Sequence, residues 1–354
     1  MSGHLGWQRA RRILAVRLDH FGDVLMTTPA LAAIRANRPD AHLALWCSPA
    51  SAAVAEATGL VDEVVPFKAP WMKHEQPDTL RWGVDQIAQR GFDAAVIFTT
   101  CTQSALPAAM ACMLAEVPLR LAHAREQSYS LLTNWVPDPD LIGPGMRHEV
   151  QRQLDLVATL GWTPHHDRLR FEIDDQRENH ALNLLRACGL PEGLPYVVMH
   201  PGATAPSRRY PAERFGAVAD GLWRERGVRT VFTGADGDQD VVQRARAAMK
   251  TLSIDLSGRL DISELGGVIA HARLLVSNNT GPAHLAAALA TPVVDLYALT
   301  NPQHTPWKSP ARVLSHDVPC RNCLKSVCPQ GHNACLTGIT TEQVLAACLE
   351  MLPT

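Results

Sequence analysis

The stretch RLLVSNNTGPAHLAAALATPVVDLY, residues 273–297, contains the pattern that decides the fold. Two apolar runs, 273–277 and 292–297, flank a segment rich in Ala and Leu. That segment opens with Gly281 and Pro282, and proline is well tolerated in the first turn of a helix. A strand, a helix and a second strand of this kind form a βαβ unit. We therefore predict two parallel strands joined by a right-handed crossover.

The same alternation recurs along the chain of 354 residues, which is long enough for two domains. In the first half we predict strands at 13–18, 42–47, 63–67 and 92–98, and helices at 24–38, 49–58, 78–90 and 146–160. In the second half we predict strands at 196–200, 229–233 and 253–256, and helices at 174–188, 211–226, 238–250 and 262–270. This is the pattern of an α/β protein with two Rossmann-like, doubly wound parallel-sheet domains, which we place at 1–170 and 171–354.

Composition argues against several classes of protein. Lys and Arg total 33 against 35 Asp and Glu, so no basic excess indicates a nucleic-acid partner. The longest uncharged stretch, 94–115, includes three threonines and Pro107, unlike the apolar run of about 20 residues that spans a membrane. The N-terminal segment lacks the apolar core of a signal peptide. We expect a cytoplasmic protein whose nine cysteines are thiols or metal ligands rather than disulfides.

Four loops after predicted strands could carry chemistry, because ligands of open α/β sheets bind at the carboxyl ends of the strands. The first loop is RLDHFGD, residues 17–23, where Gly22 permits a tight turn and Asp23 lies at or near the start of a helix. Asp23 has two interpretations. It could simply cap the helix, or it could serve as a general base at the mouth of a cleft.

The second and fourth loops have the features of anion sites. The second, 200–211 (HPGATAPSRRYP), offers Thr204 as a donor together with Arg208 and Arg209, and arginine can hold two phosphate oxygens at once. The fourth, 277–284 (SNNTGPAH), leads into a helix whose N-terminal N–H groups and positive dipole end attract anions. An ordinary surface loop and an ordinary capped helix remain the alternatives.

The third loop, 233–240 (TGADGDQD), is acidic and rich in turn residues. It lacks the G-x-G-x-x-G spacing of a dinucleotide fingerprint, so it is either a turn with a helix cap or an acceptor for ribose hydroxyls. The chain also lacks the P-loop, H-E-x-x-H and G-x-S-x-G motifs. Their absence disfavours P-loop phosphoryl transfer, zincin proteolysis and α/β-hydrolase chemistry.

Taken together, the four loops resemble glycosyltransferase family 9, the bacterial ADP-heptose:lipopolysaccharide heptosyltransferases. The resemblance rests on ILAVRLDHFGDVLMTTPAL, HPGATAPSRRYPAERF, VFTGADGD and VSNNTGPAHLAAALATPVVDLYALTNP, in that order, and on the tail CRNCLKSVCPQGHNAC. It implies a GT-B fold, in which two Rossmann-like domains face a central cleft, and an inverting sugar transfer. The first domain would bind the acceptor, and the second would bind the nucleotide-sugar donor.

The resemblance also assigns roles residue by residue. Asp23 would be the catalytic base that deprotonates the acceptor hydroxyl. The donor would be held by residues of the second domain that contact its diphosphate, ribose, adenine or sugar: Thr204, Arg208, Asp236, Leu260, Asn279, Thr280, Gly281 and His284. No cofactor is required for catalysis in this scheme, and the acceptor would be a glycolipid or related glycoconjugate, which implies peripheral contact with the inner face of the cytoplasmic membrane.

This chain departs from the family at two of these positions. Arg208 stands where the family usually has lysine, which keeps the charge but changes its geometry. Asn279 stands where the family usually has an aspartate thought to contact the donor sugar. The resemblance therefore leaves two alternatives, a nucleotide-sugar epimerase of the same fold and a non-catalytic nucleotide-sugar-binding protein. Release of ADP only in the presence of an acceptor would separate the transferase from both.

The cysteine-rich tail could bind a metal. Its C-x2-C-x4-C-x6-C spacing places four thiolates within 16 residues, which is enough to surround a tetrahedral zinc ion. The ligands would be Cys320, Cys323, Cys328 and Cys335, with a purely structural role. The alternative is a loop of reduced thiols.

Overall fold

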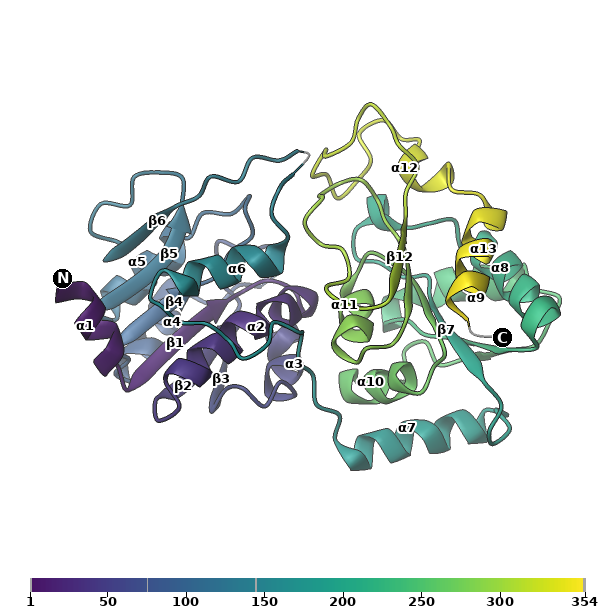
Figure 1. Cartoon of the computed structure of the whole chain (residues 1–354), viewed down its shortest axis with the longest axis horizontal. Helices are drawn as coiled ribbons and strands as arrows, with labels where there is room; N and C mark the ends of the chain where they lie inside the picture. Colours follow the sequence, from purple (N-terminus) through teal and green to yellow (C-terminus); the bar gives the residue numbers. More distant parts are fainter. Residues whose placement is uncertain (1, 75, 144, 353–354) are drawn as a thin grey trace. The chain divides into compact units, whose positions relative to one another are not determined.

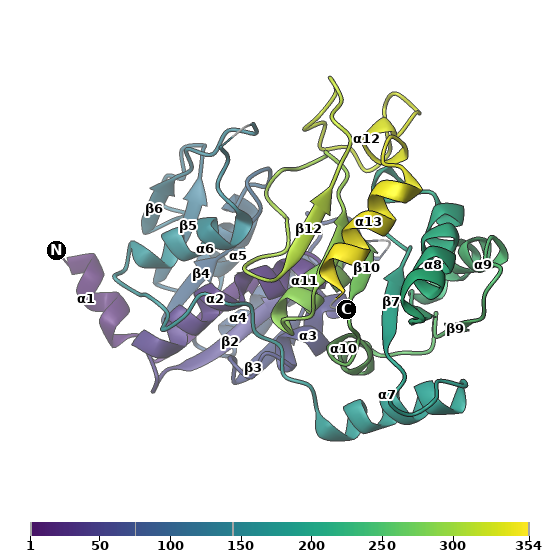
Figure 2. The same cartoon turned by 45° about the vertical axis from the view of Figure 1, so that its right-hand side comes forward.

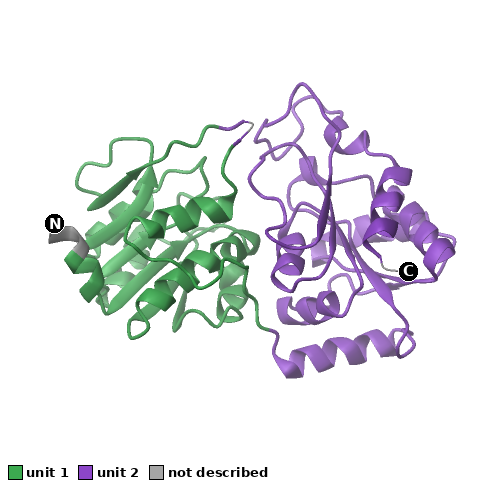
Figure 3. Ribbon diagram, viewed as in Figure 1, with its two compact units in different colours: residues 1–141, 146–172 green, residues 142–145, 173–354 purple. Residues whose placement is uncertain are grey.

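The computed structural model describes residues 2–74, 76–143 and 145–352, and the chain divides into two compact units. Unit 1 comprises 1–141 and 146–172, and unit 2 comprises 142–145 and 173–354 (Figure 3). The main boundary lies between residues 172 and 173, two residues beyond the one expected from the sequence.

Unit 1 is built on one parallel sheet, whose described strands follow the order β3-β2-β1-β4-β5-β6 (Figure 1). The strands are β1 (Arg12–Arg17), β2 (His42–Cys47), β3 (Glu63–Pro66), β4 (Ala94–Ile97), β5 (Leu119–Ala124) and β6 (Asn134–Pro137). Helices α2 (Phe21–Asn37), α3 (Ala52–Glu56) and α6 (Glu149–Ala158) pack together, and α4 (Leu80–Ala88) packs with α5 (Leu106–Leu114). The unit also has α1 (Ser2–Arg9) and a short 3-10 helix, η1 (Pro49–Ser51).

Unit 2 repeats this architecture, with described strands in the order β12-β11-β10-β7-β8-β9. They are β7 (Tyr196–His200), β8 (Arg229–Phe232), β9 (Ser253–Asp255), β10 (Leu275–Asn278), β11 (Val293–Leu296) and β12 (Ala311–Leu314). Helix α8 (Ala212–Arg226) packs against α9 (Gln239–Ala247) and α13 (Thr341–Met351), while α10 (Ile262–Ala270) packs against α7 (Asp175–Ala187) and α11 (Gly281–Ala288) (Figure 2). Two 3-10 helices, η2 (Pro206–Arg208) and η3 (Asp236–Asp238), and α12 (Ala334–Thr337) complete the unit.

Both sheets are parallel and are covered by helices, as the continuous apolar strands predict. Every residue of β4, β7, β10 and β11 is buried, which is typical of strands covered on both faces. The α/β fold expected from the sequence is confirmed. Within the described ranges, no helix combines the length and the apolar character needed to cross a bilayer.

The sequence pattern missed strands β5, β6 and β12. The edge strands β6 and β12 are half-exposed, so they have no continuous apolar run. Strand β5 contains Arg120, whose guanidinium Nε and Nη2 donate to the carbonyls of Leu131 and Ser130. A buried arginine with such partners resembles a surface residue when only the sequence is considered.

We predict that Gly216→Ala destabilises unit 2, because α8 and α9 meet at Gly216. A Cβ at this position would lie 2.2 Å from the carbonyl oxygen of Ala245, and this backbone oxygen moves only if α9 moves. The overpacking should lower the free energy of unfolding by about 1–3 kcal/mol. Gly237→Ala is the matched control, because no atom lies within 4 Å of its added Cβ, and we expect a change of about 0.5 kcal/mol or less. Urea unfolding followed by circular dichroism measures both, and equal midpoints for the two variants would contradict this packing.

Candidate functional site

In unit 1, the strand order reverses between β1 and β4. The chain runs from β1 to β2 on one side and returns on the other side through β4, so the loops after β1 and β4 diverge. Ligands of open parallel sheets bind at this kind of switch point. A pocket of about 240 Å³ lies there, lined by residues of both loops together with Trp71 and Met72.

The pocket has one polar end and apolar walls. Asp19 follows β1, and its carboxylate accepts a hydrogen bond from the side-chain amide of Gln103, which follows β4. Both residues line the pocket, together with apolar groups such as Trp71 and Pro107. An aromatic surface combined with a few fixed hydrogen-bonding groups is well suited to binding a sugar ring.

Arg17 is the centre of the polar network below this pocket. Its side chain is fully buried, at 0% exposed, and contacts three carboxylates. Its Nε lies 3.0 Å from Asp19, its Nη2 lies 3.3 Å from Asp23, and its Nη1 lies 2.9 Å from Glu149. One positive charge therefore faces three acidic groups.

This imbalance shifts the pKa values of the network. Burial alone would lower the pKa of Arg17, but the charges of Asp19, Glu149 and Asp23 outweigh burial and hold that pKa above its usual value. Burial raises the pKa of Asp19 to about 6, against the opposing effect of Arg17 and with a further rise from the charge of Asp23. Asp19 therefore loses its proton at a higher pH than an ordinary aspartate does.

Asp23 lies in the first turn of α2. It is the third residue of the helix, whose N-cap is His20, and its carboxylate accepts a hydrogen bond of 3.2 Å from the His20 backbone N–H. The same carboxylate is paired with Arg17 and is 14% exposed. The structure therefore combines the capping contact with an ion pair and leaves part of the carboxylate accessible.

The sequence analysis did not identify Glu149 and Gln153 of α6, which complete this network. The Gln153 amide donates to Glu149 at 2.7 Å and to the backbone carbonyl of Thr99 at 3.0 Å. Glu149 contacts Arg17 across 132 residues of sequence, and no local pattern indicates such a contact. The pair connects α6 to the loop that carries Gln103.

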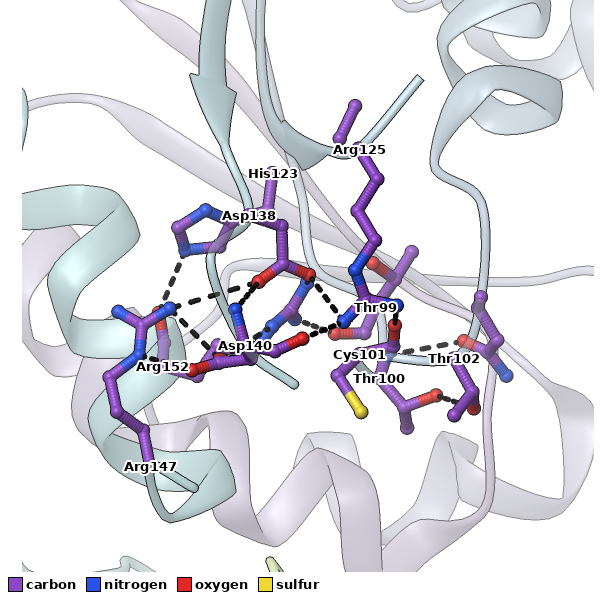
Figure 4. Close-up of polar contacts among 12 residues, drawn as sticks. Thr99, Thr100, Cys101, Thr102, His123, Arg125, Asp138, Asp140, Arg147 and Arg152 are labelled. Carbon is purple, nitrogen blue, oxygen red and sulfur yellow. Dashed lines mark hydrogen bonds and ion pairs between the residues drawn. The ribbon is translucent and has the colours of Figure 1, made fainter. Parts of the chain in front are cut away.

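A second cluster of charges contacts the same loop (Figure 4). Arg152, which is 1% exposed, donates to the carbonyl oxygen of Thr99 and, at 3.0 Å, to Asp138. Arg147 binds Asp140 through two nitrogens, each 2.9 Å from a carboxylate oxygen. These bidentate and buried contacts fix the loop after β4 and hence the wall of the pocket.

In unit 2, the strand order reverses between β7 and β10. The loop after β7 contains Thr204 and Arg208, and the loop after β10 contains Asn279, Thr280 and Gly281. Asn278 joins the two loops. Its amide nitrogen donates to the carbonyl oxygen of Pro201 at 2.7 Å, and its amide oxygen accepts from the Tyr210 N–H at 2.9 Å. The structure thus brings together the two loops that the sequence identified as anion sites.

The two arginines of the loop after β7, Arg208 and Arg209, have different surroundings. Arg209 turns back to its own loop, where its Nε donates to the carbonyl oxygen of Ala203 at 2.8 Å. Arg208 is half-buried and acts electrostatically on buried Asp295, whose pKa it lowers against the larger effect of burial. Arg208 is therefore the arginine whose charge acts on the buried carboxylate of β11.

The loop after β10 leads into helix α11. Thr280 is the N-cap in an extended conformation, Gly281 is the first helical residue, and Pro282 follows it. His284 lies in the first turn and is 4% exposed. This arrangement leaves the N-terminal N–H groups of an eight-residue helix at the switch point, as an anion site requires.

Asp236 and Leu260 lie farther along the same edge, at the ends of β8 and β9. Asp236 is exposed and Leu260 is half-buried, and the backbone N–H of Gly258 donates to the carbonyl oxygen of Gly234 at 2.9 Å. The two loops are therefore adjacent. In the same turn, the carboxylate of Asp238 packs directly against Gly202, where a Cβ would lie 2.2 Å from it.

The cysteine-rich tail supports the loop of Arg208. The backbone N–H of Ser207 donates a hydrogen bond to the carbonyl oxygen of Ser326 at 3.0 Å, and its hydroxyl donates to the carbonyl oxygen of Lys325 at 2.7 Å. The four cysteines of the tail, Cys320, Cys323, Cys328 and Cys335, are half-buried free thiols. Among the described residues, no group of three or more His, Cys, Asp or Glu side chains is arranged to hold a metal ion. The expected zinc geometry is thus not found, and zinc binding stays a prediction.

Comparison with known proteins gives a consistent set of similarities. Residues 84–334 match the model of glycosyltransferase family 9 (heptosyltransferase). Lipooligosaccharide heptosyltransferase 2 of Haemophilus ducreyi is 24% identical, over 96% of this chain and 99% of that protein. Lipopolysaccharide heptosyltransferase 2 of Escherichia coli is also 24% identical, over 94% of this chain and 96% of that protein.

Solved structures show the same fold. A glycosyltransferase family 9 protein from Veillonella parvula matches with a TM-score of 0.81 and 23% identity, over 96% of this chain and 97% of that one. The Escherichia coli ADP-heptose lipopolysaccharide heptosyltransferase II matches with a TM-score of 0.75 and 21% identity, over 96% and 98% of the two chains.

We predict that Asp19 makes the stability of unit 1 depend on pH. Because its pKa in the folded chain is about 6, above the usual value of about 3.9, the folded state holds this proton more tightly than the unfolded state. Its contribution is present below pH 4 and is lost as the pH rises to about 6. The melting temperature of Asp19→Asn, measured relative to the wild type from pH 4 to pH 8, should therefore rise through this window. A constant difference between the two proteins would show that Asp19 is an ordinary carboxylate.

Proposed function

Because the chain belongs to glycosyltransferase family 9, we propose that it transfers heptose from ADP-heptose to a hydroxyl of the lipopolysaccharide core or a related glycoconjugate. It is a glycosyltransferase with two Rossmann-like units. The observation that carries the specific proposal is the Asp23 carboxylate, which is partly accessible and is paired with buried Arg17 beside a pocket of about 240 Å³.

In the proposed reaction, Asp23 accepts the proton of the acceptor hydroxyl. The acceptor oxygen then forms a bond to the anomeric carbon of the donor, and the bond from that carbon to the diphosphate breaks. ADP leaves with the electron pair, and attack from the opposite side inverts the anomeric centre. Negative charge therefore decreases at Asp23 and grows on the diphosphate.

The unit 2 residues meet that growing charge. Arg208 supplies a permanent positive charge, and the N-terminus of α11 supplies N–H donors and about half an elementary charge. In this proposal Asp236 and Leu260, which follow the next two strands, contact the ribose and the adenine. Groups that bind the leaving diphosphate more strongly in the transition state than in the ground state accelerate the reaction.

The pocket of unit 1 supports the proposal that this unit binds the acceptor. Trp71 offers an apolar face for a sugar ring, while Asp19 and Gln103 offer hydrogen-bonding groups at its end. Arg17 joins Asp19 to Asp23, so a sugar seated in the pocket lies beside the base. Because such an acceptor is anchored in lipid, we expect the cytoplasmic enzyme to contact the inner face of the membrane peripherally.

Asp23→Asn tests the base. The amide still accepts the capping hydrogen bond from His20, so we expect a folded protein with a near-normal melting temperature that still binds ADP. Transfer should fall by roughly 10²–10⁴ because the amide cannot take the proton. Asp40→Asn, at an exposed turn of the same unit, is the control and should retain full activity. Retention of most turnover by Asp23→Asn would mean that Asp23 only caps α2.

Arg208→Ala and Arg209→Ala test the diphosphate site. Removing Arg208 should lower kcat by roughly 10- to 100-fold and weaken ADP binding, because a charge-assisted bond is worth about 1.5–3 kcal/mol. The acceptor KM should stay unchanged. Arg209→Ala should have the smaller effect, since its guanidinium is bonded to its own loop. Steady-state kinetics and ADP titration measure both variants, and the opposite ranking would assign the diphosphate to Arg209.

A further inference from the structure

Asp295 is a buried carboxylate that the proposed mechanism does not use. It lies on β11, where Ser277 of β10 is its partner in the parallel register, and the residue is 0% exposed. One carboxylate oxygen, Oδ2, accepts a hydrogen bond of 3.1 Å from the Asn279 side chain. The other oxygen, Oδ1, is buried, and no described group donates a hydrogen bond to it. Burial raises the pKa of Asp295 to about 7.

The contacts of Asn279 determine which way its amide faces. Its Nδ2 donates to Asp295 and also, at 2.7 Å, to the backbone carbonyl oxygen of His304. Both partners are acceptors, so only the nitrogen of the amide can face them, and the amide oxygen must lie on the other side. The backbone N–H of Asn279 is held as well, by the carbonyl oxygen of Leu296 at 3.3 Å.

This fixed amide stands at the donor site. Asn279 immediately precedes Thr280, the N-cap of α11, and Arg208 acts electrostatically on Asp295. An amide oxygen in this place accepts a hydrogen bond from a hydroxyl group. Because it is neutral, it does so without bringing a negative charge next to the diphosphate.

We propose that Asp295 is a positioning residue that presents the Asn279 amide oxygen to a hydroxyl of the donor's sugar, so that the two residues act as a matched pair in sugar recognition. The proposal rests on the proposed function. A sugar contact at position 279 is already implied by the family resemblance, and the structure adds the contact with Asp295 that orients the Asn279 amide.

The pair also explains why position 279 carries an amide in this chain. A carboxylate at 279 would lie about 3 Å from Asp295 and from the carbonyl oxygen of His304. Like charges so close cannot both remain ionised, so one of the two carboxyl groups would have to hold a proton. If residue 295 became an amide at the same time, it would supply a donor on its own side, while the carbonyl oxygen of His304 would still face the carboxylate. The two positions should therefore tolerate an exchange of side chains better than a change at 279 alone.

Four variants test the pair: Asn279→Asp, Asp295→Asn, Asp295→Leu and the double exchange Asn279→Asp with Asp295→Asn. Affinities for ADP and for ADP-heptose are measured by titration, and kcat and KM are measured with ADP-heptose. ADP carries no sugar, so ADP affinity reports the nucleotide site alone. The ratio of the two affinities reports the sugar subsite.

We expect Asn279→Asp and Asp295→Leu to weaken ADP-heptose binding by at least about 10-fold while ADP affinity stays within about 2-fold, since a lost or unsatisfied buried hydrogen bond typically costs about 1–3 kcal/mol. Asp295→Asn should stay close to the wild type, because its amide oxygen can still accept the bond from Asn279. The double exchange should recover part of the loss of Asn279→Asp, because only the contact with residue 295 is restored, and this non-additive result marks direct coupling. Melting temperatures show whether each variant is folded.

The outcomes separate this inference from the proposed function. If the wild type binds ADP but shows neither affinity for ADP-heptose nor transfer, the proposed function fails. If the wild type transfers heptose and the folded Asn279→Asp and Asp295→Leu variants keep its affinity ratio, the pairing inference fails. Additive effects in the double exchange would also overturn the matched pair.

Discussion

The reversal of strand order in each parallel sheet is the constraint on which the rest of this structure depends. Parallel strands carry their outgoing loops at one edge, and neighbouring loops diverge only where the order reverses. In unit 1 this happens between β1 and β4, and in unit 2 between β7 and β10. The pocket in unit 1 and the joined anion loops in unit 2 both lie at these positions. The architecture therefore decides where chemistry can occur before any reactive side chain is considered.

The Arg17 network shows how the fold then prepares a reactive group. A buried arginine needs acidic partners, and the three carboxylates that surround it exceed its single charge. Burial raises the pKa of Asp19 to about 6, so the surplus negative charge is reduced below that pH, while Asp23 is ion-paired and partly accessible. Glu149 of α6 binds the guanidinium and is itself held by Gln153, so Asp23, the proposed base, is oriented by contacts that span most of unit 1.

Local patterns predicted much of this molecule, and distant contacts account for what they missed. The apolar runs 42–47 and 196–200 are strands with those same bounds, because strands buried on both faces are apolar throughout. Asp23, Arg208 and Gly281 could be found because each follows such a strand. Glu149 could not, since its partner Arg17 lies 132 residues away. Asp295 was hidden within an apolar strand, where its charge has meaning only beside Asn279.

The proposed inverting sugar transfer is tested most directly by the fate of the donor in the presence and absence of acceptor. The wild-type chain is incubated with ADP-heptose, with and without a deacylated inner-core oligosaccharide of lipopolysaccharide, and ADP release and the product's anomeric configuration are followed by NMR. The account predicts that ADP is released only with the acceptor and that the new glycosidic bond has the opposite configuration to the donor. ADP release at an equal rate without acceptor, a product of retained configuration, or an epimerised sugar still attached to ADP would contradict it.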